Sequence, residues 1–412
     1  MPRKASFSRS PLASSSTPIY ALAAQFQDFL HLPDPSPLYV VMGSLAANMM
    51  QGDPVWLMLV GESSCGKTEL LMTLKDVDGV YVKSTLKGHP SLLSGVPKKY
   101  WKQTGKGDQE KAAKGGILRE IGDRGALIFK DFTSILAMHK DDLGEMLAAF
   151  REIYDGEWVR DVGGEGGRCL RWKGHIGFLT GVTPAVDRSH AMVSAMGERF
   201  VFFRYPYSDG WAEAFAALGR ANTPKMAAQI RESVKSFFES FGLDWKSKIE
   251  PRELSHAEKD GIIAMGQLAG TARGLVLRDT FSKEITDVPS AEKPTRITLE
   301  LGMIYRAMEF LGVEGGIGGE AWRIIKKMAL DSMPMVRSVA LREAIDMVGR
   351  NGNGPHYRTS AGRVAARGMF SDGTAKRALE ELGALRIMER SEGGGWELTE
   401  KAGDYVKRGF QK

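Results

Sequence analysis

Residues 55–68 constrain the fold and the chemistry of this chain more than any other stretch. The apolar run from Val55 to Val60 predicts a buried strand, and Gly61 ends that strand at a tight turn. An apolar helix signal follows, so the stretch has the strand–turn–helix context that a P-loop requires, which a chance glycine turn would lack. The G-x-x-x-x-G-K-[ST] spacing is matched by Gly61, Gly66, Lys67 and Thr68.

These residue types suit the binding of nucleotide phosphates. Glycines let backbone N–H groups curl around phosphate oxygens, and the helix that opens at about Lys67 directs its positive end toward them. Lys67 supplies a cation for the β- and γ-phosphates, and the Thr68 hydroxyl suits a magnesium ligand. We therefore expect ATP and Mg²⁺ as cofactors. The predicted nucleotide-binding residues are Gly61, Glu62, Ser63, Ser64, Cys65, Gly66, Lys67, Thr68 and Glu69.

The bulk composition limits the class of protein. At 412 residues the chain exceeds one ordinary core, so two or three domains are expected. No apolar run approaches the length of a membrane span and no secretory signal is seen, while two cysteines provide no disulfide framework. These features predict a reduced, cytoplasmic protein without membrane contact. The net charge of +6 is compatible with a nucleic-acid partner, and residues 1–18 are expected to form a disordered basic tail.

Val80–Lys83 predicts a second strand, and the next predicted strand, Ala126–Phe129, ends in Lys130-Asp131-Phe132. A carboxylate at this place after a P-loop is where a Walker B residue belongs, either in the magnesium shell or polarising the attacking water. If Asp131 has the first role, Phe132 replaces the usual glutamate, and if it has the second, Lys130 replaces the usual aspartate. One carboxylate is missing in either case, so the sequence does not guarantee fast hydrolysis.

Two basic segments are candidate contacts to nucleic acid. Residues 98–116 interleave lysines with Tyr100 and Trp101, which fits either a stacking contact or a solvated loop. Residues 157–173 predict a hairpin with a Gly-rich tip, which fits either a DNA channel or an ordinary surface hairpin. Its predicted DNA contacts are Arg160, Arg168, Arg171 and Lys173.

Two later segments carry further candidate catalytic groups. A predicted strand at 176–179 leads to Thr183, whose hydroxyl would lie beside the γ-phosphate. Arg199 precedes another predicted strand, Val201–Arg204. An arginine that reaches a neighbouring subunit's phosphate would assist catalysis, although such a residue is more commonly a salt-bridge partner at a helix end.

The order of these features resembles that of the AAA+ ATPases, over roughly residues 40–330. The hairpin between the Walker B-like strand and the sensor-1-like strand resembles the pre-sensor-1 hairpin group, which includes the minichromosome maintenance helicases. The segment Pro294–Ile297 resembles the sensor-2 segment of those helicases, which implies that Arg296 touches the γ-phosphate, while Thr183 stands where they carry an asparagine. The resemblance implies an α/β fold, with a P-loop parallel-sheet core, a helical lid and assembly into a hexamer or filament.

The C-terminal segment resembles a winged helix. Three predicted helices, capped before the third by Ser371 or Asp372, precede a hairpin with a Gly-rich tip. In a DNA-binding winged helix the third helix enters the major groove, so Lys376 and Arg377 are predicted DNA contacts, while a protein partner is the alternative.

We therefore expect an ATP hydrolase that acts on DNA as a homo-oligomer, such as a helicase, replication initiator or loader of a phage or mobile element. An ATP-gated DNA-binding regulator with slow hydrolysis is the alternative. The predicted catalytic residues are Asp131, Arg199, Thr183 and Arg296, with Thr68 and Asp131 as metal ligands. The expected domains are a 1–18 tail, a 19–210 core, a 211–335 helical lid and a 336–412 winged-helix domain.

Overall fold

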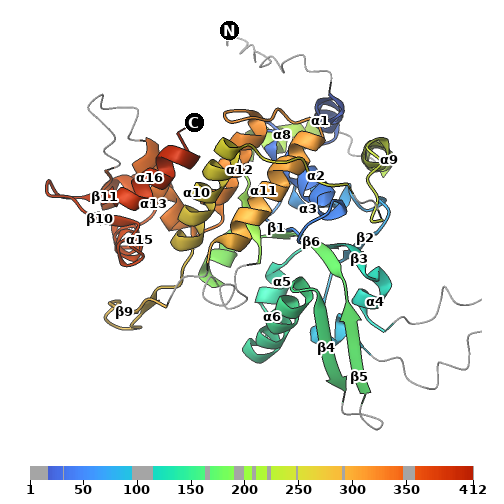
Figure 1. Cartoon of the computed structure of the whole chain (residues 1–412), viewed down its shortest axis with the longest axis horizontal. Helices are drawn as coiled ribbons and strands as arrows, with labels where there is room; N and C mark the ends of the chain where they lie inside the picture. Colours follow the sequence, from blue (N-terminus) through green and yellow to red (C-terminus); the bar gives the residue numbers. More distant parts are fainter. Residues whose placement is uncertain are drawn as a thin grey trace, which may run out of the picture.

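A parallel sheet of five strands, in the order β2-β3-β6-β1-β7, lies at the centre of the computed structural model (Figure 1). Every neighbouring pair is parallel, so the carboxyl ends of all five strands lie at one edge, which we call the carboxyl edge, and their starts at the opposite, amino edge. The predicted α/β class with a parallel-sheet core is confirmed. The strands are β1 Trp56–Val60, β2 Val80–Lys83, β3 Arg124–Phe129, β6 His175–Val182 and β7 Val201–Arg204.

Strand β1 and all but the first residue of β3 and β6 are buried, which explains why these segments are nearly continuous apolar runs, whereas the edge strand β2 is half-buried. In β1, Leu57 and Leu59 join one hydrophobic core, whereas Trp56 and Met58 join the core on the opposite face. Because strand β6 lies between β1 and β3, it separates the P-loop strand from the strand that precedes Asp131.

The first face of the sheet is covered by helices from both ends of the chain. Helix α2 is buried along its whole length, and α11 packs against it, with Gly43 leaving room for the Met308 side chain. Figure 1 shows α10, α11 and α12 standing side by side over this region. The helices of this layer are α1 Pro18–Phe29, α2 Ser36–Met49, α3 Lys67–Met72, α9 Pro224–Ser240, α10 His256–Ala272, α11 Thr295–Phe310 and α12 Glu320–Asp331.

The second face carries an aromatic cluster and the predicted hairpin, which extends away from the sheet in Figure 1. Trp56, Phe132 and Phe150 pack around Phe178 with ring centroids 5.3–6.2 Å from its own. The hairpin strands pair in antiparallel register, and Trp158 and Trp172 are buried beneath them. The elements of this layer are η1 His89–Ser91, α4 Ile117–Ile121, α5 Thr133–Leu136, α6 Lys140–Tyr154, β4 Glu157–Val162, β5 Arg168–Lys173 and η3 Pro184–Ser189.

The C-terminal elements follow the predicted order of three helices and a hairpin. Ser371, not Asp372, caps the third helix, because its side chain accepts the N–H of Thr374. A last helix was not predicted, and it packs against α10, where Gly261 and Gly409 allow close approach. The elements are α13 Met335–Asp346, α14 Ala361–Gly368, α15 Asp372–Ala384, β10 Met388–Arg390, β11 Trp396–Leu398 and α16 Glu400–Gly409.

A small hairpin lies in a stretch of polar composition that is typical of a connector. Its strands are β8 (Leu277–Arg278) and β9 (Ile285–Asp287). The Asp279 carboxylate closes the turn by accepting hydrogen bonds from the backbone N–H groups of Phe281 and Ser282. A polar side chain therefore stabilises this hairpin.

A network of ion pairs joins the sheet to the C-terminal helices. Arg204, at the end of β7, makes a two-pronged pair with Asp187 of η3 at 2.7 and 2.8 Å. Its backbone N–H donates to Asp331 of α12, which also pairs with Arg342 of α13 at 2.8 Å. Lys327 contacts the Arg204 carbonyl and the Asp331 carboxylate, and burial lowers the pKa of its ammonium group. We call these five residues the Arg204 network.

The structure describes residues 17–30, 32–94, 115–162, 168–189, 199–206, 210–219, 224–246, 249–289, 293–346 and 358–411. The basic segment 98–114 and the predicted Gly-rich tip at 163–167 therefore lie outside the described residues. Within them, no helix combines the length and apolar character needed to cross a bilayer. The expected division into four segments stays a prediction, because one hydrophobic core extends from α1 through α10, α11 and α12 to α16.

Candidate functional site

The P-loop leaves the carboxyl edge of β1 and turns directly into helix α3. Gly66 has φ of 85°, a conformation that glycine adopts at little cost, and it ends the loop at the first residue before α3. Gly61 is packed so closely that a Cβ atom there would lie 2.8 Å from the Cys65 sulfur and 3.1 Å from Tyr205. Both glycines of the motif are therefore required by geometry.

The Lys67 side chain lies inside this loop and forms hydrogen bonds with its backbone. Its ammonium group donates to the carbonyl oxygens of Gly61 at 2.7 Å and Glu62 at 2.5 Å, and the residue is 8% exposed. Thr68, the next residue, is exposed at the same edge. A phosphate group that enters the loop would exchange these carbonyl acceptors for charged oxygens, which form stronger hydrogen bonds with a lysine.

The ends of β3 and β6 meet the P-loop at the carboxyl edge. Gly61 donates its N–H to Val182, and a Cβ at Gly181 would lie 3.6 Å from the Lys67 side chain. The Thr183 hydroxyl lies 3.5 Å from that of Thr133, which follows β3. The structure thus brings the predicted Thr183 and the end of β3 beside Lys67.

Asp131 is exposed to solvent at this edge. The carboxylate accepts the N–H of Thr133 at 2.9 Å, which fixes its direction. Phe132 is fully buried in the aromatic cluster, so its position cannot supply a second polar group. Asp131 is also the sole acidic residue between residues 124 and 140.

Arg199 and Arg296 lie at the amino edge, away from the P-loop of the same chain. Arg199 precedes β7, whose Val201 pairs with Leu57 near the start of β1. Its guanidinium group pairs with both oxygens of Asp155 at 2.9 and 3.0 Å, and its side chain is 5% exposed. The two guanidinium groups lie 5.5 and 5.3 Å from the centre of the Tyr154 ring.

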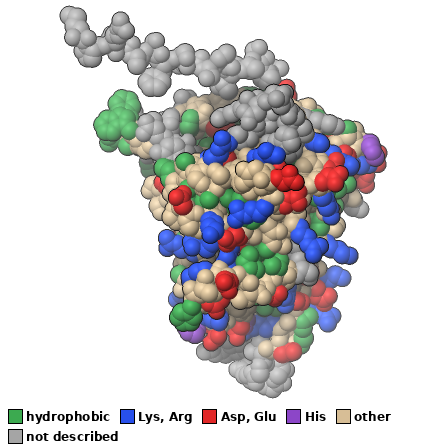
Figure 2. Space-filling view, turned by 90° about the vertical axis from the view of Figure 1, so that its left-hand side faces the viewer, with side chains coloured by type: hydrophobic (Ala, Val, Ile, Leu, Met, Phe, Trp, Pro, Cys, Tyr) green, Lys and Arg blue, Asp and Glu red, His purple; other side chains and the backbone are tan. Residues whose placement is uncertain are grey.

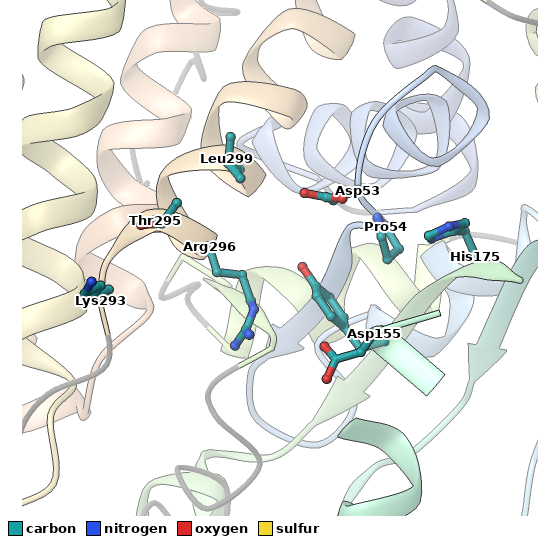
Figure 3. A pocket seen from close by; sticks show the side chains of 9 residues that line it. Asp53, Pro54, Asp155, His175, Lys293, Thr295, Arg296 and Leu299 are labelled. Carbon is teal, nitrogen blue, oxygen red and sulfur yellow. The ribbon is translucent and has the colours of Figure 1, made fainter. Parts of the chain in front are cut away.

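A pocket of about 440 Å³ opens at this amino edge, and Figure 3 shows Arg296 reaching from the start of α11 toward the Asp155 side. Tyr154 donates its hydroxyl proton to Glu300 at 2.8 Å, and burial together with that carboxylate raises the pKa of the phenol. The phenol thus stays neutral, and its hydrogen bond to Glu300 fixes the ring close to both guanidinium groups. The pocket is lined by Asp53, Pro54, Tyr154, Asp155, His175, Lys293, Thr295, Arg296 and Leu299.

A smaller, mainly apolar pocket of about 200 Å³ adjoins the P-loop helix. Phe29 ends α1, Ile230 lies on α9, and Thr68 and Glu69 belong to α3, so three segments far apart in sequence meet here. Helical periodicity in the sequence gives no sign that these helices converge. The other lining residues are Met72, Thr73, Ala227 and Arg231.

The predicted DNA contacts are at the surface, and several have partners within the chain. Arg160 donates to the carbonyl oxygen of Leu93 at 2.7 Å, and Arg171 lies 3.3 Å from Glu157. Lys173 is exposed, and the side chain of Arg168 lies outside the described part of the structure. On α15, Lys376 and Arg377 are both exposed.

Comparisons with known proteins find only remote likeness. No protein-family model and no curated protein sequence matches the chain. Among solved structures, the A-form apo structure of the NrS-1 C-terminal region is similar, with a TM-score of 0.31, 9% identity and coverage of 95% of this chain and 78% of that chain. The Hsp104–ADP complex of S. cerevisiae has a TM-score of 0.25 and 14% identity over 88% of this chain and 40% of its own. The RuvB Holliday junction branch migration motor of Thermotoga maritima has a TM-score of 0.22 and 16% identity over 90% and 92%. Sequence identities and TM-scores this low assign no function to the chain.

Proposed function

We propose that this protein is an ATP hydrolase of the AAA+ type that acts on DNA and completes its active site with a neighbouring subunit. The observation that carries the proposal is the convergence of Lys67, Asp131 and Thr183 at the carboxyl edge. Lysine binds phosphate oxygens, a hydroxyl polarises or positions water, and a carboxylate supports either metal or water.

The side chains at the carboxyl edge fit Mg²⁺ bound with a nucleotide. The Thr68 hydroxyl and the Asp131 carboxylate are hard oxygen donors, the type that this cation prefers, and both are exposed at the same edge. The metal would neutralise charge on the β- and γ-phosphates. Lys67 would hold the same phosphates, and Asp131 and Thr183 would orient the attacking water.

The small pocket beside α3 suits an adenine ring, because it is apolar and directly adjoins Thr68. Replacing Ala227 with phenylalanine would fill this space without removing core packing, so we expect ATP affinity to fall by about tenfold or more. Ala228→Phe is the matched control, because Ala228 is exposed on the same helix. Titration with a fluorescent ADP analogue measures the effect, and equal affinity in the two variants would place the base elsewhere.

Arg199 and Arg296 are proposed to act on the nucleotide of the adjacent subunit. Both lie at the amino edge, separated from their own P-loop by the length of β1, about 16 Å. The Arg199 side chain is 5% exposed and its partner Asp155 is 54% exposed, so Arg199 would have to exchange this carboxylate for the neighbour's phosphate as the subunits meet. A head-to-tail assembly, which closes as a ring or extends as a filament, would bring the two edges together.

DNA is the proposed substrate of the assembly, and the C-terminal segment supplies the main support. Residues 336–412 carry 14 Lys and Arg but 10 Asp and Glu, which accounts for much of the net charge of +6. Figure 2, which faces the side that carries these elements, shows Lys and Arg side chains spread over the surface with Asp and Glu among them. On β4 and β5, by contrast, the exposed charges of Arg171 and Lys173 are offset by Glu157 and Asp161.

The decisive experiment measures ATP turnover by the purified protein with no DNA, with single-stranded DNA and with duplex DNA. We expect stimulation of about tenfold or more by DNA, together with DNA affinity that falls steeply with salt. Lys376→Ala/Arg377→Ala should reduce the affinity and the salt dependence, whereas Lys401→Ala/Lys407→Ala on α16 is the charge-matched control. Salt-insensitive, negligible DNA binding would overturn DNA as the substrate.

One observation favours the alternative of an ATP-gated regulator. Asp131 is the sole acidic residue between residues 124 and 140, and Lys130 and Phe132 flank it. Such a site binds ATP tightly and hydrolyses it slowly, so tight binding without DNA-stimulated turnover would establish the switch in place of the motor.

A further inference from the structure

Helix α8 (Gly210–Gly219) exposes a continuous apolar stripe. Trp211, Phe215 and Leu218 are 80%, 73% and 89% exposed, and their spacing of four and three residues places them on one helical face. Figure 2 shows hydrophobic side chains projecting from the molecule at the height of α8 in Figure 1. Single exposed apolar residues are ordinary, but a stripe of two aromatics and a leucine marks an interaction surface.

The chain leads to α8 from the carboxyl edge. Tyr205 donates its N–H to Val60 at 2.8 Å and packs against Gly61 of the P-loop. Gly210, the first residue of α8, is five residues further on, a separation of at most about 18 Å. The start of the stripe therefore lies within about 18 Å of a residue that contacts the P-loop.

We infer that this stripe is the docking surface for a second copy of the chain, whose amino edge covers it. The inference rests on the proposed function, because a shared active site requires the neighbour's Arg199 and Arg296 to face the P-loop. The amino edge also offers an apolar acceptor: Leu299 is 47% exposed, and with Pro54 it lines the 440 Å³ pocket. Stripe and acceptor are different surfaces, as a head-to-tail contact requires.

The chemistry and size of the stripe support a protein occupant. Its exposed members carry no charge, so nothing in the stripe attracts a nucleic-acid backbone. Two aromatics and a leucine bury roughly 500 Å², while a stable interface buries about 800 Å² per partner. The stripe would thus supply the greater part of such an interface, and the arginine edge with its surroundings would supply the rest.

The test compares Phe215→Glu, Leu299→Glu and the control Phe281→Glu by sedimentation velocity with Mg²⁺ and ATPγS. Phe281 is 93% exposed in the β8–β9 turn, so it matches Phe215 in type and exposure but lies outside the proposed contact. We expect the wild type and the control to associate, and each of the other two variants to raise the dissociation constant at least tenfold. An equal mixture of those two should form dimers without larger species, because each retains one intact surface.

Binding of a fluorescent ADP analogue by each variant verifies that the P-loop is intact. Association of Phe215→Glu at wild-type strength would overturn the α8 inference and leave the shared site standing. A wild type that stays monomeric while it hydrolyses ATP would overturn both. If the stripe instead binds lipid vesicles or another protein, Phe215→Glu would lose that binding and keep wild-type self-association. That result would also overturn the inference.

Discussion

Replacing Lys67 with alanine is expected to lower ATP turnover at least about 100-fold. The Lys67 ammonium group lies inside the loop, 2.7 Å from the Gly61 carbonyl, and no other lysine or arginine of the P-loop stretch 61–69 can replace it. Its loss removes the charge that binds the β- and γ-phosphates. Steady-state phosphate release measures the effect, and titration with the fluorescent ADP analogue separates lost binding from lost chemistry.

Lys75→Ala is the matched control for this change. Lys75 follows the same helix and is exposed to solvent, so its removal changes the net charge equally but leaves the loop intact. We expect wild-type turnover from this control. DNA-stimulated turnover that survives in Lys67→Ala would show that the activity does not come from this P-loop, and the proposed function would fall.

Replacing Arg199 with alanine is expected to lower turnover by about 10³-fold while leaving nucleotide affinity nearly unchanged. Arg199 is separated from its own P-loop, so its loss spares binding and removes charge stabilisation at the neighbour's phosphate. Its ion-pair partner Asp155 is 54% exposed and remains solvated in the variant. Arg151→Ala, an exposed arginine on α6, is the control that should behave as wild type.

Mixing two inactive variants tests whether the arginine acts between subunits. Lys67→Ala retains Arg199, and Arg199→Ala retains its P-loop, so some contacts in a mixed assembly join both intact halves. We expect activity to reappear on mixing, up to about a quarter of the wild-type value at equal amounts for random pairing. No recovery, with mixed assemblies demonstrated by sedimentation, would restrict Arg199 to a structural pair with Asp155.

The strands and the P-loop were predictable because each is encoded by a short, contiguous pattern of residues. Val55–Val60 is apolar at every position, as a strand buried on both faces must be, and the motif spacing fixes the turn that follows. The hairpin was predictable for a similar reason, since a Gly-rich turn separates two short β-type segments. For the same reason Ser371 was foreseen as one of two caps, and only the side-chain geometry distinguished it from Asp372.

The sites formed by distant segments were not predictable from periodicity. Nothing in the local sequence around Tyr154 indicates that its ring lies close to both Arg199 and Arg296, which are separated by almost a hundred residues of sequence. Likewise, Phe29 and Ile230 line one pocket only because α1 and α9 pack together. Such contacts depend on the strand order and on long-range helix packing, and a local sequence pattern predicts neither of these.

The Arg204 network links the end of β7 to η3, α12 and α13, and we expect these elements to move as one rigid unit. Asp187 lies just beyond Thr183, and Asp331, which is 3% exposed, links β7 to α12 and α13. Separating desolvated partners is costly, so η3 and these helices should shift together and not by independent side-chain rearrangements. If the proposed function holds, a displacement beside the bound γ-phosphate would move the elements that carry Lys376 and Arg377, and each turnover would reposition the proposed DNA contacts.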